Sequence, residues 1–579
     1  MAMTNRQARP RKRRRFGPPF LVLLLLTAAL VVSYRYWNDR PNQEHVAPDF
    51  GGLAKPVYYA GELLKPEAIG SGETLALPLP VVEKHLDPYI RYEADSQSVI
   101  ITTTDRVVRM KTRELTAFLN DKPFSLQVPV EEKNKVTYVP VQALKDYYRF
   151  QLSESSDTGA VLLKKEGDAI QWAKVPANEK HPSRTVSLRS LPTVKAPIYS
   201  DLKQEQSVML WGEEEGWYRA QTESGILGYV QKEDLILDRT ETVPVQPETP
   251  AFDPGKPLGE KINLTWQQIW STKPDLDKIG DMPGLNVISP QWLHLLDGEG
   301  TVTTKADLAY SKWAHDRGYR IWALFNNGFD PDRTSQALAS YDTRIKVIKQ
   351  LAAYAEMYQM QGINVDFENV YLKDKENFVQ FLREMAPILH EQGLVVSVDI
   401  TVKGGSEVYS KFLDRKALAE AADYLILMGY DEHWATSQTA GSVASLPWVE
   451  EGVSRILEED GVPADKFILG VPFYTRIWTE ETVDGKKKVS SKAYSMDYIQ
   501  SLIKEKNLTP VMLDDIGQHY VEYKEDGKTM KIWIEDAVSM QKRMDIISKY
   551  DLAGVASWSR GMESANIWPL MQKALKVQP

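Results

Sequence analysis

Two acidic side chains, Asp366 and Glu368, lie two residues apart in the mainly apolar segment from Gly362 to Val370. The segment alternates between apolar and polar residues, which predicts a β-strand with Asn364, Asp366 and Glu368 on one face. Two carboxyl groups in a row are costly to bury unless hydrogen bonding or chemistry requires them. Their spacing suits proton transfer in a catalytic site. A hydrogen-bonded pair at the end of a strand is the structural alternative.

Strand-like and helical segments alternate from about residue 260 to the end of the sequence. Between the strands, apolar residues recur at helical spacing, as in Ile345, Ile348 and Leu351. This order predicts an α/β fold, a C-terminal (β/α)8 TIM barrel, whose active site lies at the C-terminal ends of its strands. Residues from about 476 to 535 exceed an ordinary loop and predict a small insertion. The predicted strands are Ile262–Leu264, Leu285–Ser289, Ile321–Phe325, Ile363–Phe367, Val395–Ile400, Tyr424–Met428, Phe467–Val471 and Gly554–Trp558.

Four segments of this region resemble motifs of glycoside hydrolase family 18, the chitinase-like hydrolases. Gly362-Ile-Asn-Val-Asp-Phe-Glu368 falls on the fourth predicted strand and resembles the family's D-G-x-D-x-D-x-E signature. Its form, N-x-D-F-E-N, is most similar to the bacterial spore-germination, cortex-lytic N-acetylglucosaminidase type. The other three segments, in the family's order along the chain, are Met428-Gly-Tyr-Asp431, Gly470-Val-Pro-Phe-Tyr474 and Gly554-Val-Ala-Ser-Trp558.

The resemblance implies the chemistry of three catalytic residues. Family 18 hydrolyses its glycan with retention, and the substrate's own acetamido oxygen acts as the nucleophile. Glu368 would be the general acid and later the base, with a pKa raised by burial beside Asp366. Asp366 would orient the acetamido N–H and stabilise the oxazolinium cation. Tyr430 would hold the acetamido carbonyl group.

Further residues are candidate substrate contacts because of their places in or near the motifs. Trp558 would form the floor under a sugar ring, although packing in the core is its structural alternative. Met428 would form a pocket wall, whereas Asp431 suits a substrate contact and a structural cap of its loop equally well. Trp292 follows the second predicted strand, and Asn326 follows the third. The predicted substrate-binding residues are Asn364, Met428, Asp431, Trp558, Tyr474, Trp292 and Asn326.

Two residues depart from the chitinase signature. Gln361 and Asn364 stand where the family has its first two aspartates. In the chitinase pattern the middle aspartate exchanges a proton with the residue that matches Asp366. A neutral Asn364 can bond Asp366 but cannot share its charge. We therefore expect Asp366 to stay ionised and to lie closer to Glu368, with a changed pH profile.

The N-terminal 40 residues form a separate segment. Seven basic residues precede the apolar run Phe20–Val32. Phe16 and Tyr34 extend the run to roughly 17–19 residues, which is just long enough to span a bilayer. This pattern predicts a single transmembrane helix within residues 1–40, with a cytoplasmic N-terminus and residues 41–579 outside the cytoplasm. A cleaved signal peptide is the alternative, but no Ala-x-Ala-like site follows the run. The basic residues suit this orientation better than nucleic-acid binding.

Three further regions lie between the N-terminal segment and the barrel at 258–579. Residues 55–165 resemble the small N-terminal domain of copper amine oxidases, which serves as a stalk; without a histidine cluster, no copper is implied. Residues 183–238 resemble a bacterial SH3 domain, which either contacts the cell wall or acts as a spacer. Both are predicted to be mainly β. Residues 239–257 contain five prolines and predict a stiff linker.

Composition narrows the classes of function. The chain has 579 residues, 43% apolar and 26% charged, as expected for several globular domains. It has no cysteine, which excludes disulfides, thiolate metal sites and cysteine nucleophiles. Its eight histidines show no ligand spacing, so we predict neither a metal nor a cofactor. Because residues 1–40 are strongly basic, the remainder is more acidic than the net charge of −9, which favours a neutral or zwitterionic ligand.

These features together predict a membrane-anchored, extracytoplasmic glycosidase whose partner is an N-acetylated polysaccharide. Peptidoglycan, including its spore-cortex form, is the expected substrate, with chitin or an exopolysaccharide as alternatives. The rival class is a non-catalytic glycan-binding or scaffold protein of the cell envelope. The presence of Glu368 favours the enzyme, because lectin-like relatives typically lack that acid.

Overall fold

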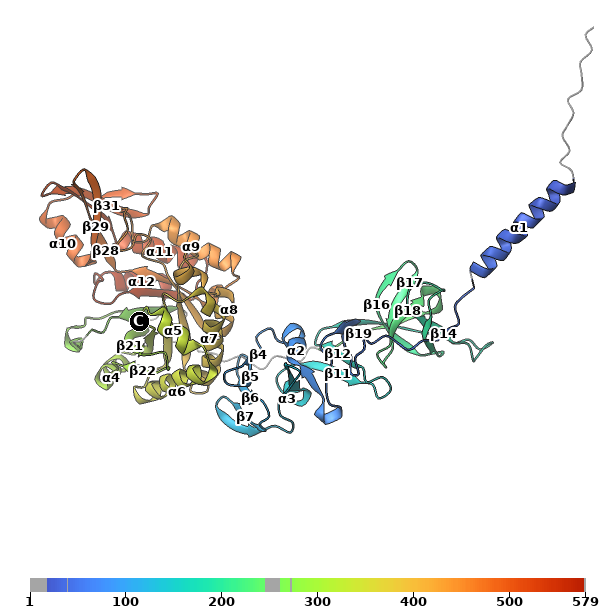
Figure 1. Ribbon diagram of the computed structural model, residues 1–579. Coiled ribbons are helices and arrows are strands. Elements are labelled where there is room, and N and C mark those ends of the chain that lie inside the picture. Colours follow the sequence, from blue (N-terminus) through green and yellow to red (C-terminus); the bar gives the residue numbers. More distant parts are fainter. Residues whose placement is uncertain (1–17, 39, 245–260, 271–272, 577–579) are drawn as a thin grey trace, which may run out of the picture. The chain divides into compact units, whose positions relative to one another are not determined.

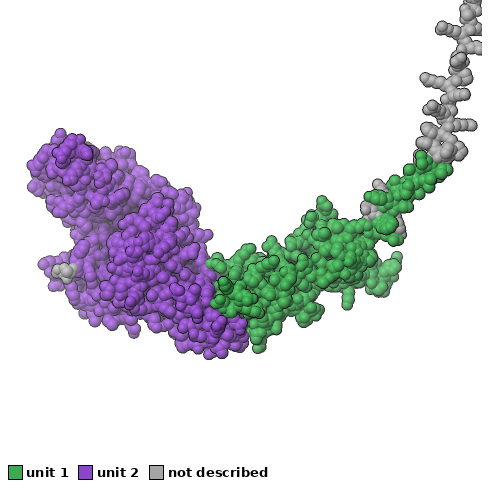
Figure 2. All heavy atoms as spheres, viewed as in Figure 1, with its two compact units in different colours: residues 1–88, 132–247 green, residues 89–131, 248–579 purple. Residues whose placement is uncertain are grey.

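The computed structural model describes residues 18–38, 40–244, 261–270 and 273–576 (Figure 1). The chain forms two compact units (Figure 2). The first comprises residues 1–88 and 132–247, and the second comprises residues 89–131 and 248–579. The short segment 89–131 therefore belongs to the same unit as the C-terminal region, although it is separated from that region in the sequence.

Eight parallel strands form a closed barrel in the second unit, which confirms the predicted (β/α)8 architecture. Strand β20 pairs with both β33 and β21, and this pairing closes the ring. Each predicted strand overlaps an observed one. In ring order, the barrel strands are β20 (Ile262–Gln267), β33 (Gly554–Trp558), β27 (Phe467–Pro472), β26 (Tyr424–Met428), β25 (Val395–Ile400), β24 (Gly362–Asp366), β23 (Arg320–Asn326) and β21 (Val287–Leu295), to which the short β22 (Val302–Thr304) adds an antiparallel edge.

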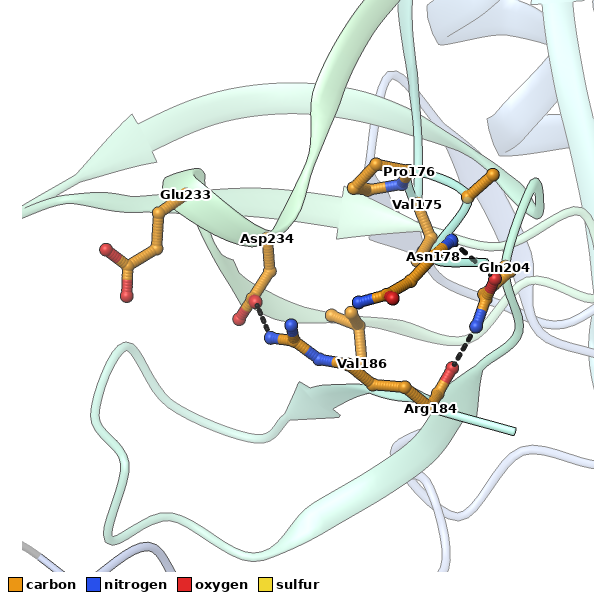
Figure 3. Close-up of a pocket in the computed structure, with 9 residues that line it drawn as sticks. Val175, Pro176, Asn178, Arg184, Val186, Gln204, Glu233 and Asp234 are labelled. Carbon is orange, nitrogen blue, oxygen red and sulfur yellow. Dashed lines mark hydrogen bonds and ion pairs between the residues drawn. The ribbon is translucent and has the colours of Figure 1, made fainter. Parts of the chain in front are cut away.

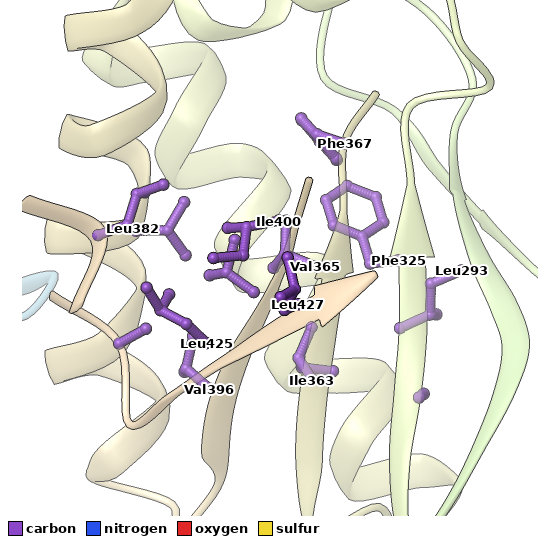
Figure 4. Packing of buried hydrophobic residues seen from close by; sticks show 14 of the residues in the cluster. Leu293, Phe325, Ile363, Val365, Phe367, Leu382, Val396, Ile400, Leu425 and Leu427 are labelled. Carbon is purple, nitrogen blue, oxygen red and sulfur yellow. The ribbon is translucent and has the colours of Figure 1, made fainter. Parts of the chain in front are cut away.

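Helices cover the outside of the barrel, and the main apolar core lies between them and the strands. Ile363 and Val365 of β24 belong to this core together with Leu382 of helix α7 (Figure 4). Ile345 and Leu351, which the sequence predicted to face the core, are buried on helix α6. The helices are α4 (Leu308–Asp316), α5 (Pro331–Leu338), α6 (Tyr341–Met357), α7 (Lys375–His390), α8 (Arg415–Ala421), α9 (Leu446–Glu459), α11 (Ala537–Lys549) and α12 (Ile567–Leu575).

An insertion follows strand β27, close to the bounds predicted from the sequence. It contains a five-stranded antiparallel sheet in the order β29-β28-β32-β31-β30, with one helix packed on it. Its elements are β28 (Tyr474–Val483), β29 (Lys486–Ser495), α10 (Met496–Glu505), β30 (Val511–Leu513), β31 (Gln518–Glu525) and β32 (Lys528–Ile534).

A second antiparallel sheet, formed by residues of the segment 89–131, packs against the helices of the barrel. Ile100 and Val107 of this sheet are fully buried in the apolar core of the barrel. The buried guanidinium group of Arg344 on α6 contacts the carboxylates of Glu384 on α7 at 2.7 Å and of Glu93 on the sheet at 2.5 Å. Both apolar burial and ion pairing therefore fix the sheet to the barrel. Its strands are β4 (Arg91–Glu93), β5 (Ser98–Thr102), β6 (Val107–Lys111), β7 (Thr116–Leu119) and β8 (Lys122–Ser125).

The first unit is mainly β, as predicted. Its largest sheet has seven strands in the order β15-β14-β18-β17-β16-β13-β19, and it extends beyond the predicted bounds 183–238 on both sides. The elements between residues 57 and 242 outside the sheet β4–β8 are β1 (Val57–Tyr59), β2 (Glu62–Leu64), β3 (Ala76–Pro78), α2 (Leu79–His85), β9 (Glu131–Lys133), β10 (Val136–Pro140), α3 (Val141–Lys145), β11 (Phe150–Glu154), β12 (Val161–Lys165), β13 (Ala169–Lys174), β14 (Val186–Arg189), β15 (Ile198–Leu202), β16 (Ser207–Glu214), β17 (Trp217–Gln221), β18 (Leu227–Gln231) and β19 (Ile236–Thr242).

A small cavity of about 90 Å³ lies beside this seven-stranded sheet (Figure 3). The ion pair between Arg184 and Asp234, 3.1 Å long, crosses it, and the Gln204 side chain accepts a 2.7 Å hydrogen bond from the Asn178 backbone N–H. Ligand pockets usually measure about 300–1,000 Å³. The cavity is therefore too small for a glycan, and the cell-wall contact of the SH3-like region stays a prediction.

Helix α1 (Pro18–Asn38) contains the apolar run near the N-terminus. Within residues 18–38, 40–244, 261–270 and 273–576, no helix is long and apolar enough to cross a membrane. The structure therefore does not support the predicted transmembrane helix. The predicted linker at 239–257 lies largely outside the described residues.

Candidate active site

Strand β24 directs Asn364 and Asp366 into the interior of the barrel, because the alternate residues Ile363 and Val365 face the helices. Asn364 is fully buried and Asp366 is 9% exposed. The strand begins at Gly362, where a Cβ atom would lie 2.8 Å from the carbonyl oxygen of Val395 on β25. Glycine thus allows the close approach of the two strands that carry the polar groups.

The Asn364 carboxamide is fully bonded to residues of other strands. Its oxygen accepts hydrogen bonds from Trp266 Nε1 on β20 at 2.8 Å and from Ser289 Oγ on β21 at 3.2 Å. Its Nδ2 donates to Asp399 Oδ1 on β25 at 2.8 Å and to Ser397 Oγ at 3.2 Å. The expected bond from Asn364 to Asp366 is therefore replaced by a bond to Asp399.

Glu368 lies just beyond the end of β24, which stops at Asp366 and not at Phe367 as predicted. Asn327, which follows β23, holds its backbone on both sides. Asn327 Nδ2 donates to the Glu368 carbonyl oxygen at 2.7 Å, and Asn327 Oδ1 accepts from the Glu368 N–H at 3.2 Å. Asn327 is only 1% exposed and also donates to Thr334 Oγ1. The side chain of Glu368 thus projects from a firmly held backbone.

Burial dominates the electrostatics of the carboxyl groups. It raises the pKa of Glu368, and the nearby charges of Asp366 and Asp431 raise it further. A raised pKa is expected for a general acid, because the carboxyl group must carry its proton near neutral pH. Burial also raises the pKa of Asp366, whose Oδ1 is buried without a hydrogen-bond partner. The structure therefore does not support the expectation of a readily ionised Asp366.

Aromatic side chains from three strand ends lie together beside these carboxyl groups. The rings of Tyr430 and Trp558 are stacked, with centroids 6.4 Å apart and an interplanar angle of 23°. The indole of Trp266 lies edge-on to both, at 6.3 and 5.8 Å. Burial, with the charges of Asp399 and Asp366, raises the pKa of Tyr430, so its hydroxyl group is a neutral hydrogen-bond donor. Met428 ends β26 two residues before Tyr430.

Asp431 is bonded to residues at the start of the insertion. Its Oδ1 accepts hydrogen bonds from the Tyr474 hydroxyl at 2.5 Å and from Arg476 Nη2 at 3.2 Å. The Asp431 side chain is still 45% exposed. Asp431 therefore links the strand-six motif to the strand-seven motif, and its exposed part can also meet a ligand.

Of the last two predicted substrate contacts, Asn326 lies at the site and Trp292 lies in the core. Asn326 ends β23 in register with Asp366, and its Oδ1 accepts from the Gly328 N–H at 3.1 Å. Trp292, by contrast, is 1% exposed and packs edge-on against Tyr310, with ring centroids 5.4 Å apart. Its predicted substrate contact is not supported, because β21 continues to Leu295 and keeps Trp292 in the core.

Sequence reasoning missed three residues of the site, namely Trp266, Asn327 and Asp399. Trp266 and Asp399 lie in strands that carry no recognised motif. Asn327 could have been noticed, since the Asn-Asn-Gly sequence at 326–328 follows a predicted strand and is typical of a turn.

Comparison with known families identifies the barrel. Residues 293–563 match the model of Glycosyl hydrolases family 18, and residues 61–163 match that of the Copper amine oxidase N-terminal domain. The chain thus carries a family 18 glycosyl hydrolase domain and is a glycosidase by class. The second match includes the sheet β4–β8, which the structure joins to the barrel.

Individual relatives agree with this assignment. The chain is 25% identical over 287 residues to the uncharacterized glycosylase YvbX of Bacillus subtilis (strain 168), covering 48% of this chain and 81% of that protein. It is 26% identical over 256 residues to the cortical fragment-lytic enzyme of Bacillus anthracis, covering 43% and 58%. The chain spans less than two thirds of the length of this second relative.

Solved structures show the same fold. The structure of the spore cortex-lytic enzyme SleL of Bacillus cereus superimposes with a TM-score of 0.50 at 21% identity. The superposition covers 59% of this chain and 78% of that structure.

Proposed function

We propose that the protein hydrolyses β-linked N-acetylglucosamine-containing glycan by a substrate-assisted, retaining mechanism. The observation that carries the proposal is a half-buried, backbone-fixed Glu368 close to Asp366 and to Tyr430, whose ring is stacked on that of Trp558. A protonated carboxyl group, a second carboxyl group and an aromatic platform are the parts that this reaction needs.

The steps follow from the positions of these groups. Glu368 donates its proton to the glycosidic oxygen as the bond from that oxygen to C1 breaks. The acetamido carbonyl oxygen of the substrate then bonds to C1, while Asp366 stabilises the positive charge and the Tyr430 hydroxyl donates to the acetamido oxygen. In the second step the Glu368 carboxylate takes a proton from water, whose oxygen attacks C1 and reopens the oxazolinium ring.

Exposed aromatic side chains favour a polymeric substrate. Trp270, Phe329, Tyr409 and Trp434 are 45–70% exposed, and each lies in a loop that follows a barrel strand, at the end where Glu368 lies. Aromatic faces complement the apolar C–H face of sugar rings. These residues would hold sugars on both sides of the cleaved bond.

Peptidoglycan, including its spore-cortex form, is the substrate that we propose, and chitin is the alternative. The relatives named as cortical fragment-lytic enzyme and as spore cortex-lytic enzyme support the first. We infer an extracytoplasmic location, because peptidoglycan lies there and because basic residues followed by the apolar run Phe20–Val32 are typical of export.

Digestion of purified glycans tests this function. Wild-type protein and Glu368→Gln are incubated with peptidoglycan, spore cortex and chitin, and the released fragments are separated and identified. We expect the wild type to release fragments with N-acetylglucosamine at the new reducing end, and Glu368→Gln to release none. Binding to any of these glycans without release by the wild type would instead identify a glycan-binding protein.

A further inference from the structure

Two aspartates lie side by side on neighbouring strands of the barrel interior. In the parallel pair of β24 and β25, Asn364 is opposite Ser397 and Val365 is opposite Val398. Asp366 and Asp399 occupy the next positions of this register and face the interior. They are 9% and 3% exposed, respectively. Since neighbouring strands are about 4.8 Å apart, the two carboxyl groups lie within reach of each other.

Asn364 fixes the orientation of Asp399. Its Nδ2 donates to Asp399 Oδ1 at 2.8 Å, while Trp266 Nε1 and Ser289 Oγ hold its oxygen. The amide cannot rotate without breaking these bonds, so it presents N–H groups to Asp399. A carboxyl group at position 364 could not serve as such a donor when ionised.

We propose that Asp399 is the proton partner of Asp366 and replaces the carboxyl group that position 364 lacks. The inference rests on the proposed hydrolase function and extends it to a positioning residue on another strand. Asp366 and Asp399 together hold one proton. When the substrate binds, Asp366 acts as the carboxylate that meets the acetamido group, and the proton remains on Asp399. No net proton is gained or lost in this exchange.

Among the described residues, the groups that act most strongly on Asp399 include no positive charge that would neutralise it instead. The titratable groups that act on it are Asp366 and Glu368, and Tyr430 lies on the next strand end. Its hydrogen-bond partner Asn364 is neutral. Two buried like-charged carboxyl groups cannot both ionise readily, so proton sharing is the arrangement that costs least.

Asp399→Asn tests the proposal, because the new amide keeps the size and can still accept the bond from Asn364. We expect kcat to fall by roughly tenfold to a hundredfold with little change in KM, less than the loss of a direct acid. The alkaline limb of the pH–rate profile should move to lower pH. Once the shared proton is lost at alkaline pH, the wild-type pair carries two negative charges and the variant carries one, so Glu368 ionises more easily in the variant.

The double variant Asn364→Asp/Asp399→Asn returns a carboxyl group to strand β24 and should restore both kcat and the alkaline limb towards the wild type. Asp316→Asn, which removes one exposed carboxylate on α4, is the control for a general change in charge. If Asp399→Asn keeps the wild-type profile, or if the double variant restores nothing, Asp399 is not the proton partner of Asp366.

The pH dependence of thermal stability can be measured without enzymatic activity, so it tests the role of Asp399 independently of the proposed hydrolase function. A carboxyl group whose pKa is raised by folding stabilises the protein at low pH and loses that contribution as pH rises through its folded pKa. The Tm of Asp399→Asn relative to the wild type should therefore be higher near pH 8 than near pH 5. An equal difference at both pH values would overturn the inference even in an active enzyme. A pH-dependent difference in a protein that cleaves no glycan would overturn only the proposed function.

Discussion

Glu368 combines two constraints that are usually separate: its backbone is fixed by Asn327, while its side chain is only partly exposed to water. The fixed backbone sets the position of the proton, and burial sets the pH at which the proton is present. Sequence alone predicted the acid and Asp366, because both lie within one short motif. It could not predict Asp399 or Trp266, or the bonds from Asn327 to Glu368, since these contacts cross between strands and depend on register and ring closure.

The pH dependence of hydrolysis should reflect Glu368. The general acid must be protonated, and burial raises its pKa to about 8. We expect kcat/KM to decrease as pH rises through this value, with the loss complete about two units higher. Steady-state rates on a soluble oligosaccharide of N-acetylglucosamine between about pH 4 and 10 would show this. A rate that falls with the pKa of an ordinary glutamic acid would contradict the assignment.

Asn327→Ala should impair catalysis through the position of Glu368. The change removes both backbone contacts of Glu368 and leaves buried polar groups unpaired, at a cost of about 1–3 kcal/mol in the free energy of unfolding. We expect kcat to fall by about tenfold or more with a smaller change in KM. Asn369→Ala, which removes an exposed bond to the Phe329 carbonyl, is the matched control. Equal effects of both variants would argue against a specific role for Asn327.

At the scale of elements, the sheet of the barrel was predictable because its strands are buried on both faces and are separated by amphipathic helices. The ends of the strands were less predictable. The predicted second strand stopped at Ser289, whereas β21 continues to Leu295 and buries Trp292. Side chains in the loops after the strands have no periodicity, so only the structure shows which of them gather at the catalytic end.

The exposed aromatic residues of these loops give a prediction about substrate length. Trp434→Ala should reduce the rate on polymeric glycan by several-fold, because a sugar–aromatic contact is worth about 1 kcal/mol. The rate on a disaccharide-sized chromogenic substrate should change little. Met357→Ala, an exposed residue at the C-terminal end of α6 and thus at the opposite end of the barrel, is the control. Equal losses on short and long substrates would contradict a binding role for Trp434.

At the scale of the whole molecule, the second unit is assembled from two distant parts of the chain. The family match at residues 61–163 and the predicted domain at 55–165 both treat residues 89–131 as part of one continuous N-terminal module. The structure places this segment with the barrel. Sequence patterns could not show this, because the strands are ordinary and the ion pairs that attach them join residues more than 200 positions apart.

The network of Arg344, Glu384 and Glu93 should therefore contribute strongly to stability. Glu93→Ala removes a carboxylate that contacts the Arg344 guanidinium and accepts from the Tyr341 N–H at 2.6 Å. Because Arg344 keeps its two bonds to Glu384, the variant loses charge-assisted hydrogen bonds without leaving an unpaired charge. This costs about 1.5–3 kcal/mol, and urea unfolding should show a loss of this size. Lys312→Ala breaks an exposed pair with Asp316 and should cost less than about 1 kcal/mol. A small loss in Glu93→Ala would mean that this network contributes little to the attachment of the sheet.

The attachment of the sheet β4–β8 to the barrel has a consequence for synthesis. The sheet leaves the ribosome first, yet the helix α7 that completes its environment ends only at His390. At about 5–20 residues per second, the interval between residues 131 and 390 is roughly 10–50 s. During that time Ile100 and Val107 lack the barrel core that buries them in the finished protein. The nascent chain thus carries these exposed apolar side chains for longer than most domains need to fold.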